Sequence, residues 1–269
     1  MNKYFTIIFV LIIFAAQAQA QVPVPAPNQT QSILLVGATL HRGDGTPALQ
    51  NSAIAFDNGK ITFVGTAEQV SRSQYQQVVD VAGKHVYPSF IAPSTTLGLN
   101  EVDAVRAARD DAEVGKYNPS VRSLIAYNAE SEVMPTCKNT GVLVAQIVPQ
   151  GGTISGSSSV VQLDAWNYED AVLLAEDGIH LNWCNTESKT YSEDVAKLYD
   201  YFSQAQRYQT VTMGDKQNLH FEAMRAIFLG NGKIYIHENS AKGILEITSS
   251  QSLCASDVSS SFGLLNFSK

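Results

Sequence analysis

The pattern of apolar residues changes at Pro88. Before it, over residues 33–86, short segments of alternating hydrophobicity are separated by turns, and Asn58-Gly59 lies between two apolar runs. Asn-Gly is a strong hairpin signal because both residues readily take a positive φ. Residues 33–88 are therefore predicted to form a small all-β domain.

After Pro88, apolar β-branched runs alternate with amphipathic stretches. Strands are predicted over residues 89–94, 141–150 and 233–239. Helices are predicted from the capping-box spacing at Thr190 onward, over 218–230 and over 240–247, and the mixed charges of 101–115 predict a solvated helix face. Strand–helix alternation indicates a parallel sheet that binds ligands at the carboxyl ends of its strands.

The two ends of the chain differ in composition from the rest. Residues 1–20 carry a positive start, an apolar run and a small-x-small cleavage site, so they are predicted to be a secretory signal peptide. Residues 21–32 read as a Pro-rich linker, and residues 248–269 as a Ser-rich, atypical tail. The expected location of the mature protein is the periplasm or the exterior.

The charge, the length of the apolar run and the cysteines argue against nucleic-acid binding, a membrane span, a disulfide framework and a zinc ribbon. The formal net charge is −7, and no cluster of Lys and Arg is present, so no electrostatic footprint for nucleic acid is expected. The apolar run near the N-terminus is shorter than the ~20 residues needed to cross a bilayer, so no membrane span is expected after signal cleavage. Three widely spaced cysteines indicate neither a disulfide framework nor a zinc ribbon.

Four histidines and one glycine-rich stretch have both structural and functional interpretations. His180 is expected to be a hydrogen-bonded packing residue, with a pocket-lining role as the alternative, and His220 is expected on a helix surface. His41 and His85 are expected to be structural residues of the β domain. Residues 149–159 are predicted to be a loop over the mouth of the barrel, and backbone binding of an anion is the alternative.

Four stretches carry a resemblance to a known family: ILLVGATLHRGDG, NGKITFVG, VVDVAGKHVYPSFIAPS and KIYIHENSAKGI. Between Ile33 and Ile247 the chain resembles the amidohydrolase superfamily, and most of all its imidazolonepropionase-like branch. The resemblance implies the α/β class: an N-terminal β-sandwich followed by a (β/α)8 TIM-like barrel over residues 89–247. About 250 residues make a full barrel, so an incomplete one of about five units is expected here.

The resemblance also implies metal-dependent hydrolysis of non-peptide carbon–nitrogen bonds. Family members activate water on a divalent metal, commonly zinc, held partly by a His-x-His on the first barrel strand. Those two positions fall on Ser94 and Thr96, whose neutral hydroxyls are poor zinc ligands. His237 matches the ligand of the fifth strand and is the one metal-site residue carried over, while no catalytic residue is assigned.

The implied function is a hydrolase impaired by an incomplete ligand set. The alternative is a non-catalytic binding or partner protein of the cell envelope built on the same fold. The expected partner is a small-molecule substrate or ligand, with a second copy of the chain or an active paralogue as a further partner.

Overall fold

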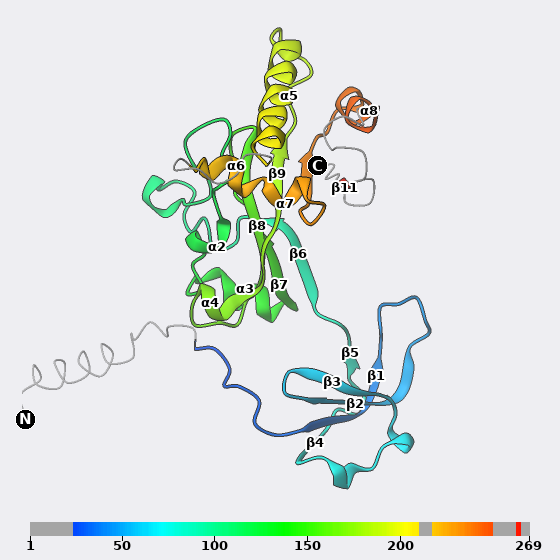
Figure 1. Cartoon of the computed structure of the whole chain (residues 1–269). Coiled ribbons are helices and arrows are strands. Elements are labelled where there is room, and N and C mark those ends of the chain that lie inside the picture. Colours follow the sequence, from blue (N-terminus) through cyan, green and yellow to red (C-terminus); the bar gives the residue numbers. More distant parts are fainter. Residues whose placement is uncertain (1–23, 210–216, 250–261, 265–269) are drawn as a thin grey trace, which may run out of the picture.

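The computed structural model describes residues 24–209, 217–249 and 262–264. Figure 1 shows an all-β unit and a larger unit of sheet and helices, joined through the extended run of β5 (His85–Val86) and β6 (Phe90–Thr95). The signal-peptide prediction and most of the predicted tail lie outside the described residues. Within the described part of the chain, no helix is long and apolar enough to cross a membrane.

The N-terminal unit is one five-stranded sheet. Its strands are β1 (Ile33–Leu40), β2 (Leu49–Asp57), β3 (Lys60–Thr66), β4 (Gln77–Asp80) and β5, in the order β3-β2-β1-β4 with β5 also paired to β1. The predicted hairpin forms between β2 and β3, where Asn58 and Gly59 have φ of 49° and 70°. Every second residue of β1 is buried, which is the period expected of a strand with one buried face.

The second unit is built on a six-stranded sheet in the order β11-β10-β9-β8-β7-β6. Its further strands are β7 (Val142–Ile147), β8 (Ile154–Gln162), β9 (Val172–Asn182), β10 (Ile234–His237) and β11 (Phe262–Leu264). The sheet curls as an open part of a barrel, and the predicted fold class is confirmed.

The direction of β8 corrects the prediction of a parallel sheet. β8 pairs antiparallel with both β7 and β9, whereas the other neighbours are parallel. The predicted loop over 149–159 is accordingly wrong from Ile154 onward. The serines of β8 are buried, and the hydroxyls of Ser155 and Ser158 donate to main-chain carbonyls of β9, so that polar residues typical of loops are accommodated inside a sheet.

The helices lie mainly on one face of this sheet. They are α2 (Ser123–Ala126), α3 (Val133–Asn139), α4 (Tyr168–Ala171), α5 (Tyr191–Tyr208), α6 (Leu219–Ala223), α7 (Arg225–Phe228) and α8 (Ala241–Ser249). The predicted helix from Thr190 is confirmed as α5, and the one predicted over 218–230 is divided in two at Met224. The predicted helix over 101–115 is wrong: it holds a single 3-10 turn, Arg106–Ala108, flanked by extended residues.

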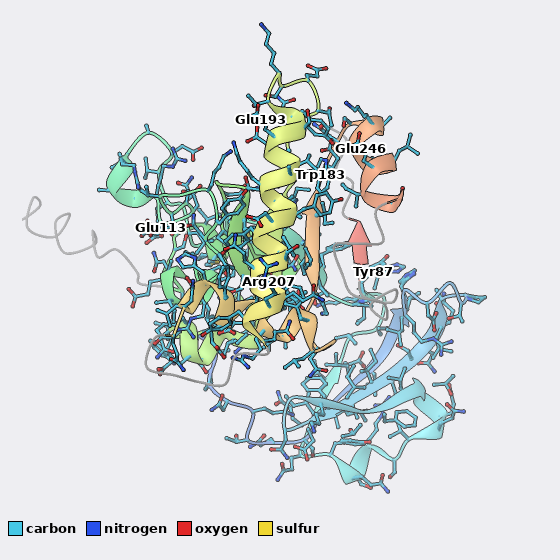
Figure 2. All side chains as sticks on the ribbon, turned by 45° about the horizontal axis from the view of Figure 1, so that its top comes forward. Tyr87, Glu113, Trp183, Glu193, Arg207 and Glu246 are labelled. Atoms are coloured by element: carbon cyan, nitrogen blue, oxygen red, sulfur yellow. The ribbon has the colours of Figure 1, made fainter. Side chains whose placement is uncertain are left out.

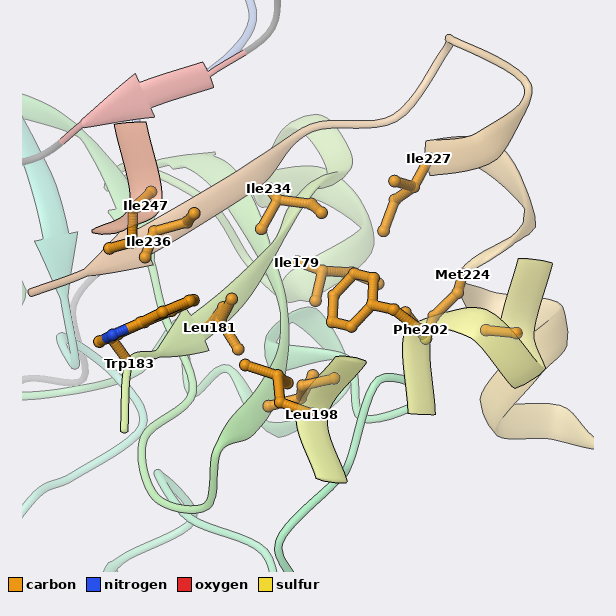
Figure 3. Close-up of a cluster of buried hydrophobic side chains, with 12 residues drawn as sticks. Ile179, Leu181, Trp183, Leu198, Phe202, Met224, Ile227, Ile234, Ile236 and Ile247 are labelled. Carbon is orange, nitrogen blue, oxygen red and sulfur yellow. The ribbon is translucent and has the colours of Figure 1, made fainter. Parts of the chain in front are cut away.

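The main core fixes which side chains face away from the helices. Ile179 and Leu181 of β9 pack with Leu198 and Phe202 of α5 and with neighbouring residues of β10 (Figure 3). Successive side chains of a strand point to opposite faces. The residues between these apolar positions therefore point to the inner face of the curled sheet, where the candidate site lies.

Candidate functional site

His180 and His237 form a hydrogen-bonded pair on the inner face of the sheet. Nδ1 of His180 and Nε2 of His237 are 2.7 Å apart, and the ring centroids are 5.0 Å apart. The pair forms because β9 and β10 are adjacent and parallel, with His180 opposite Tyr235 and His237 opposite Asn182. His180 is thus a hydrogen-bonded buried residue, as predicted, and it also contacts the residue carried over as a metal ligand.

Both imidazoles are neutral near neutral pH. Burial, with a smaller effect of the neighbouring His237, lowers the pKa of His180 to about 3. Burial also lowers the pKa of His237. Nε2 of His180 is buried and has no hydrogen-bond partner among the described residues. An unpaired polar atom inside a protein costs stability and is a common mark of a functional site.

A second group of polar residues, centred on Asp177, holds the aromatic ring that packs against the pair. Asp177 accepts hydrogen bonds from Lys233 Nζ at 2.7 Å, Tyr235 OH at 2.7 Å and Gln146 Nε2 at 2.9 Å. The Tyr235 ring stacks on His180 with centroids 4.9 Å apart. Burial alone raises the pKa of Asp177, but the bonds from Lys233 and Tyr235 outweigh it and lower the pKa overall. Asp177 therefore stays ionised and fixes the ring that packs against His180.

Ser94, one of the two strand-one positions that lack histidine, lies at the other end of this network. Ser94 has φ of 49°, at a point where the pairing of β6 with β7 changes register. Its amide N–H donates to Gln146 Oε1 at 3.2 Å, and Gln146 in turn reaches Asp177. Ser94 is therefore tied to the network through its backbone. The structure shows no hydrogen bond from the Ser94 or Thr96 side chain to either histidine.

The residues present do not fit a bound zinc ion on their own. Among the described residues, no three His, Cys, Asp or Glu side chains lie close enough to hold a metal. Two nitrogens on a tetrahedral zinc would lie about 3.3 Å apart, from zinc–nitrogen distances of 2.0–2.1 Å. The two imidazoles are closer than this and bond to each other. The carried-over ligand, His237, is thus present without the partners that a zinc site needs.

A cavity of about 590 Å³ opens at the carboxyl ends of β9 and β10. It is lined by Trp183, Asn185, Thr186, Glu187, His237, Glu238, Asn239 and Ser240. Trp183 Nε1 donates to Tyr191 OH at 3.1 Å, and that hydroxyl donates to Glu246 of α8; Figure 2 shows Trp183 beside α5 and Glu246 on α8. Ligands of parallel α/β sheets bind at this end of the strands. His237 lines the cavity and is also the histidine that bonds to His180.

The remaining histidines lie elsewhere. His220 is exposed on α6, as predicted. His41 and His85 belong to the N-terminal sheet, where their Nε2 and Nδ1 atoms are 2.9 Å apart and Tyr87 stacks on His41. The sequence alone did not single out Asp177, Tyr235 or Gln146. Alternation along the strands could have placed Gln146 and Tyr235 on the inner face, but it puts Asp177 on the same face as Ile179.

Comparisons with known proteins agree with this architecture. No family model matches the chain. Imidazolonepropionases of Bacillus thuringiensis (strain Al Hakam) and Bacillus cereus (strain B4264) are each 45% identical over 51 residues, which is 19% of this chain and 12% of theirs. The solved structure of an amidohydrolase from Thermotoga maritima MSB8 matches with a TM-score of 0.69 and 20% identity, over 80% of this chain and 60% of that one. The chain thus shares its fold with that amidohydrolase structure, and a stretch of 51 residues is similar to part of the imidazolonepropionases, of whose length it spans 12%.

Proposed function

We propose that this protein binds a small molecule at the cavity beside His237, and that metal-dependent hydrolysis of carbon–nitrogen bonds is impaired in it. The observation that carries the proposal is the direct bond between His180 and His237. It occupies one ring nitrogen of each histidine, while a cavity of about 590 Å³ stays open next to His237. Cavities of this size are typical of small-molecule sites.

The chemistry of the pair supports binding. Two neutral imidazoles offer hydrogen bonds but no positive charge, and Asp177 and Tyr235 hold one of them in place. The two fixed, neutral imidazoles and the polar side chains of the cavity can orient a ligand without a chemical reaction. We also propose that the protein acts outside the cytoplasm, because residues 1–20 have the pattern of a signal peptide.

An active hydrolase of non-peptide carbon–nitrogen bonds is the second candidate. The fold and the similarity to imidazolonepropionases favour it, since both support a hydrolase family. It requires additional metal ligands beyond the two histidines that the structure brings together.

One set of measurements separates the two candidates. Purified protein is screened by thermal shift against cyclic amides, linear amides, amines and carboxylates. Its zinc content and amide hydrolysis are measured with and without added zinc. The proposal predicts ligands that raise the melting temperature, less than one zinc per chain and no zinc-dependent hydrolysis.

Two histidine variants locate the effect. His237→Gln should abolish the shifts caused by ligands, whereas His220→Gln, at an exposed histidine on α6, should leave them unchanged. Stoichiometric zinc with hydrolysis that disappears in His237→Gln would establish the second candidate. The absence of any ligand that depends on His237 would refute binding at this cavity.

A further inference from the structure

The cavity beside His237 carries carboxylates and no basic side chain. Glu187 and Glu238 are the charged residues of its lining, and no Lys or Arg belongs to that lining. The wall of the cavity is therefore negative.

Neither carboxylate is neutralised within the described part of the chain. The structure shows no ion pair for Glu187, and Glu238 Oε1 accepts only the backbone N–H groups of Asn239 at 2.9 Å and Ser240 at 2.5 Å. Lys242 follows shortly in the sequence, but its Nζ lies 4.6 Å from the ring centroid of Tyr191 and does not line the cavity. Both glutamates thus have acceptor atoms left for a ligand.

The form of the cavity favours an organic cation over a metal ion. Within the described residues, Glu187, Glu238 and His237 do not make a group that could hold a metal together. The cavity has a volume of about 590 Å³, which is more than a bare ion would fill. Trp183 provides one of the few apolar surfaces in its lining. A molecule that carries an N–H cation on a small carbon frame could reach a carboxylate and the imidazole at once.

We infer that the cavity takes a small organic cation, such as an amine, amidine or guanidine, bound through Glu187 and Glu238. This inference rests on the proposed function, because it names the class of ligand for the same cavity. Charge-assisted hydrogen bonds between N–H groups and carboxylates supply the selectivity, and His237 in the lining offers a further hydrogen bond.

Three probes of nearly equal size and different charge test the inference. Benzamidine is a cation, benzamide is neutral and benzoate is an anion. Binding is followed by NMR at the Trp183 indole N–H, which is assigned by Trp166→Phe because the chain has two tryptophans. Benzamidine should bind about tenfold more tightly than benzamide, and benzoate should bind more weakly than either.

Matched variants assign the selectivity to the two glutamates. Glu187→Gln and Glu238→Gln should each reduce the preference for benzamidine by about threefold or more, and salt should weaken binding to the parent protein. The control is Glu193→Gln, an exposed carboxylate in the first turn of α5 that is absent from the lining. Thermal unfolding confirms that each variant is folded.

The outcomes separate the two proposals. If benzamide or benzoate binds as tightly as benzamidine and perturbs Trp183, the cavity is a ligand site and the inferred charge is wrong. If the preference for benzamidine persists in both glutamine variants, the named carboxylates do not provide it. If the charge panel leaves Trp183 unperturbed and the wider screen also finds no ligand dependent on His237, both the inference and the proposed function fail.

Discussion

His180 illustrates how one residue can cost stability and still define a site. Its side chain is fully buried, and only one of its ring nitrogens has a hydrogen-bond partner among the described residues. Leaving a buried polar group unpaired costs about 1–3 kcal/mol. An apolar residue at this position would avoid that cost. The position next to His237 and the stacked ring of Tyr235 give the histidine a geometry that packing alone would not require.

The buried pair predicts a stability that falls in acid. The pKa of His180 is about 3 in the folded protein, against an ordinary value of 6.5, so the unfolded chain takes up a proton first as the pH falls. Stability is therefore retained above about pH 6.5 and lost toward pH 3, by up to about 1.4 kcal/mol per pH unit. Urea unfolding at several pH values measures the slope.

A leucine variant shows which residue causes this slope. His180→Leu should reduce the slope of the pH dependence below about pH 6.5, because one of the two buried histidines with a lowered pKa is removed. His220→Leu, at an exposed histidine, should leave the slope of the parent protein unchanged. An unchanged slope in His180→Leu would mean that other groups dominate the acid transition.

At the scale of elements, the pairing of β9 with β10 positions the site. Gly178 lies on β9, and a Cβ added there would be 2.6 Å from Cε2 of Tyr235 and 2.9 Å from its Cδ2. No real Cβ contact is that short, so the tyrosine ring packs over Gly178 because glycine has no side chain. This close packing keeps the Tyr235 hydroxyl on Asp177 and its ring on His180.

Gly178→Ala should therefore destabilise the protein by about 1–3 kcal/mol and displace the Tyr235 ring. Urea unfolding gives the loss, and NMR signals of His180 report the lost stacking. A double-mutant cycle tests the cause: in a Tyr235→Ala background, Gly178→Ala should cost clearly less. Equal costs in both backgrounds would place the strain elsewhere on β9.

At the scale of the whole molecule, the segment before β1 contacts both units. The Ala26 amide donates to Asp164 Oδ2 of the larger unit at 3.0 Å, and Lys138 Nζ donates to Oδ1 of the same carboxylate at 2.6 Å. Gln29 bonds the β2–β3 hairpin, where it donates to Phe56 O and accepts from Gly59 N–H. The segment predicted from the sequence to be a linker thus makes hydrogen bonds to both units.

Loss of the Asp164 carboxylate should release one end of this segment. In Asp164→Ala, the Ala26 amide should exchange with solvent markedly faster, whereas the Gly59 amide, bonded to Gln29, should keep its rate. The hydrogen bond from Lys138 lowers the pKa of Asp164 below its ordinary value of 3.8, so in the parent protein the contact should persist below that pH and weaken in stronger acid. Hydrogen exchange by NMR checks both statements, and an unchanged Ala26 rate would contradict the first.

The sequence was sufficient for local features and insufficient for contacts between distant residues. Asn58-Gly59 and the apolar face of α5 identified a hairpin and a helix because their signals are local. His237 was found by resemblance, but its partner His180 lies 57 residues earlier, and only the pairing of β9 with β10 joins them. β8 was missed because serines and glycines usually mark loops, and here neighbouring strands bury them.

The reversed direction of β8 has a consequence for the order in which the molecule folds. β7, β8 and β9 follow one another along the chain and pair with their sequence neighbours, so each pairing closes only a short loop. The parallel pairings of β6 with β7 and of β9 with β10 close longer loops, at a greater cost in chain entropy. The three-stranded meander is therefore expected to form first and to act as a template. His180 would then be in place before β10 brings His237 to it.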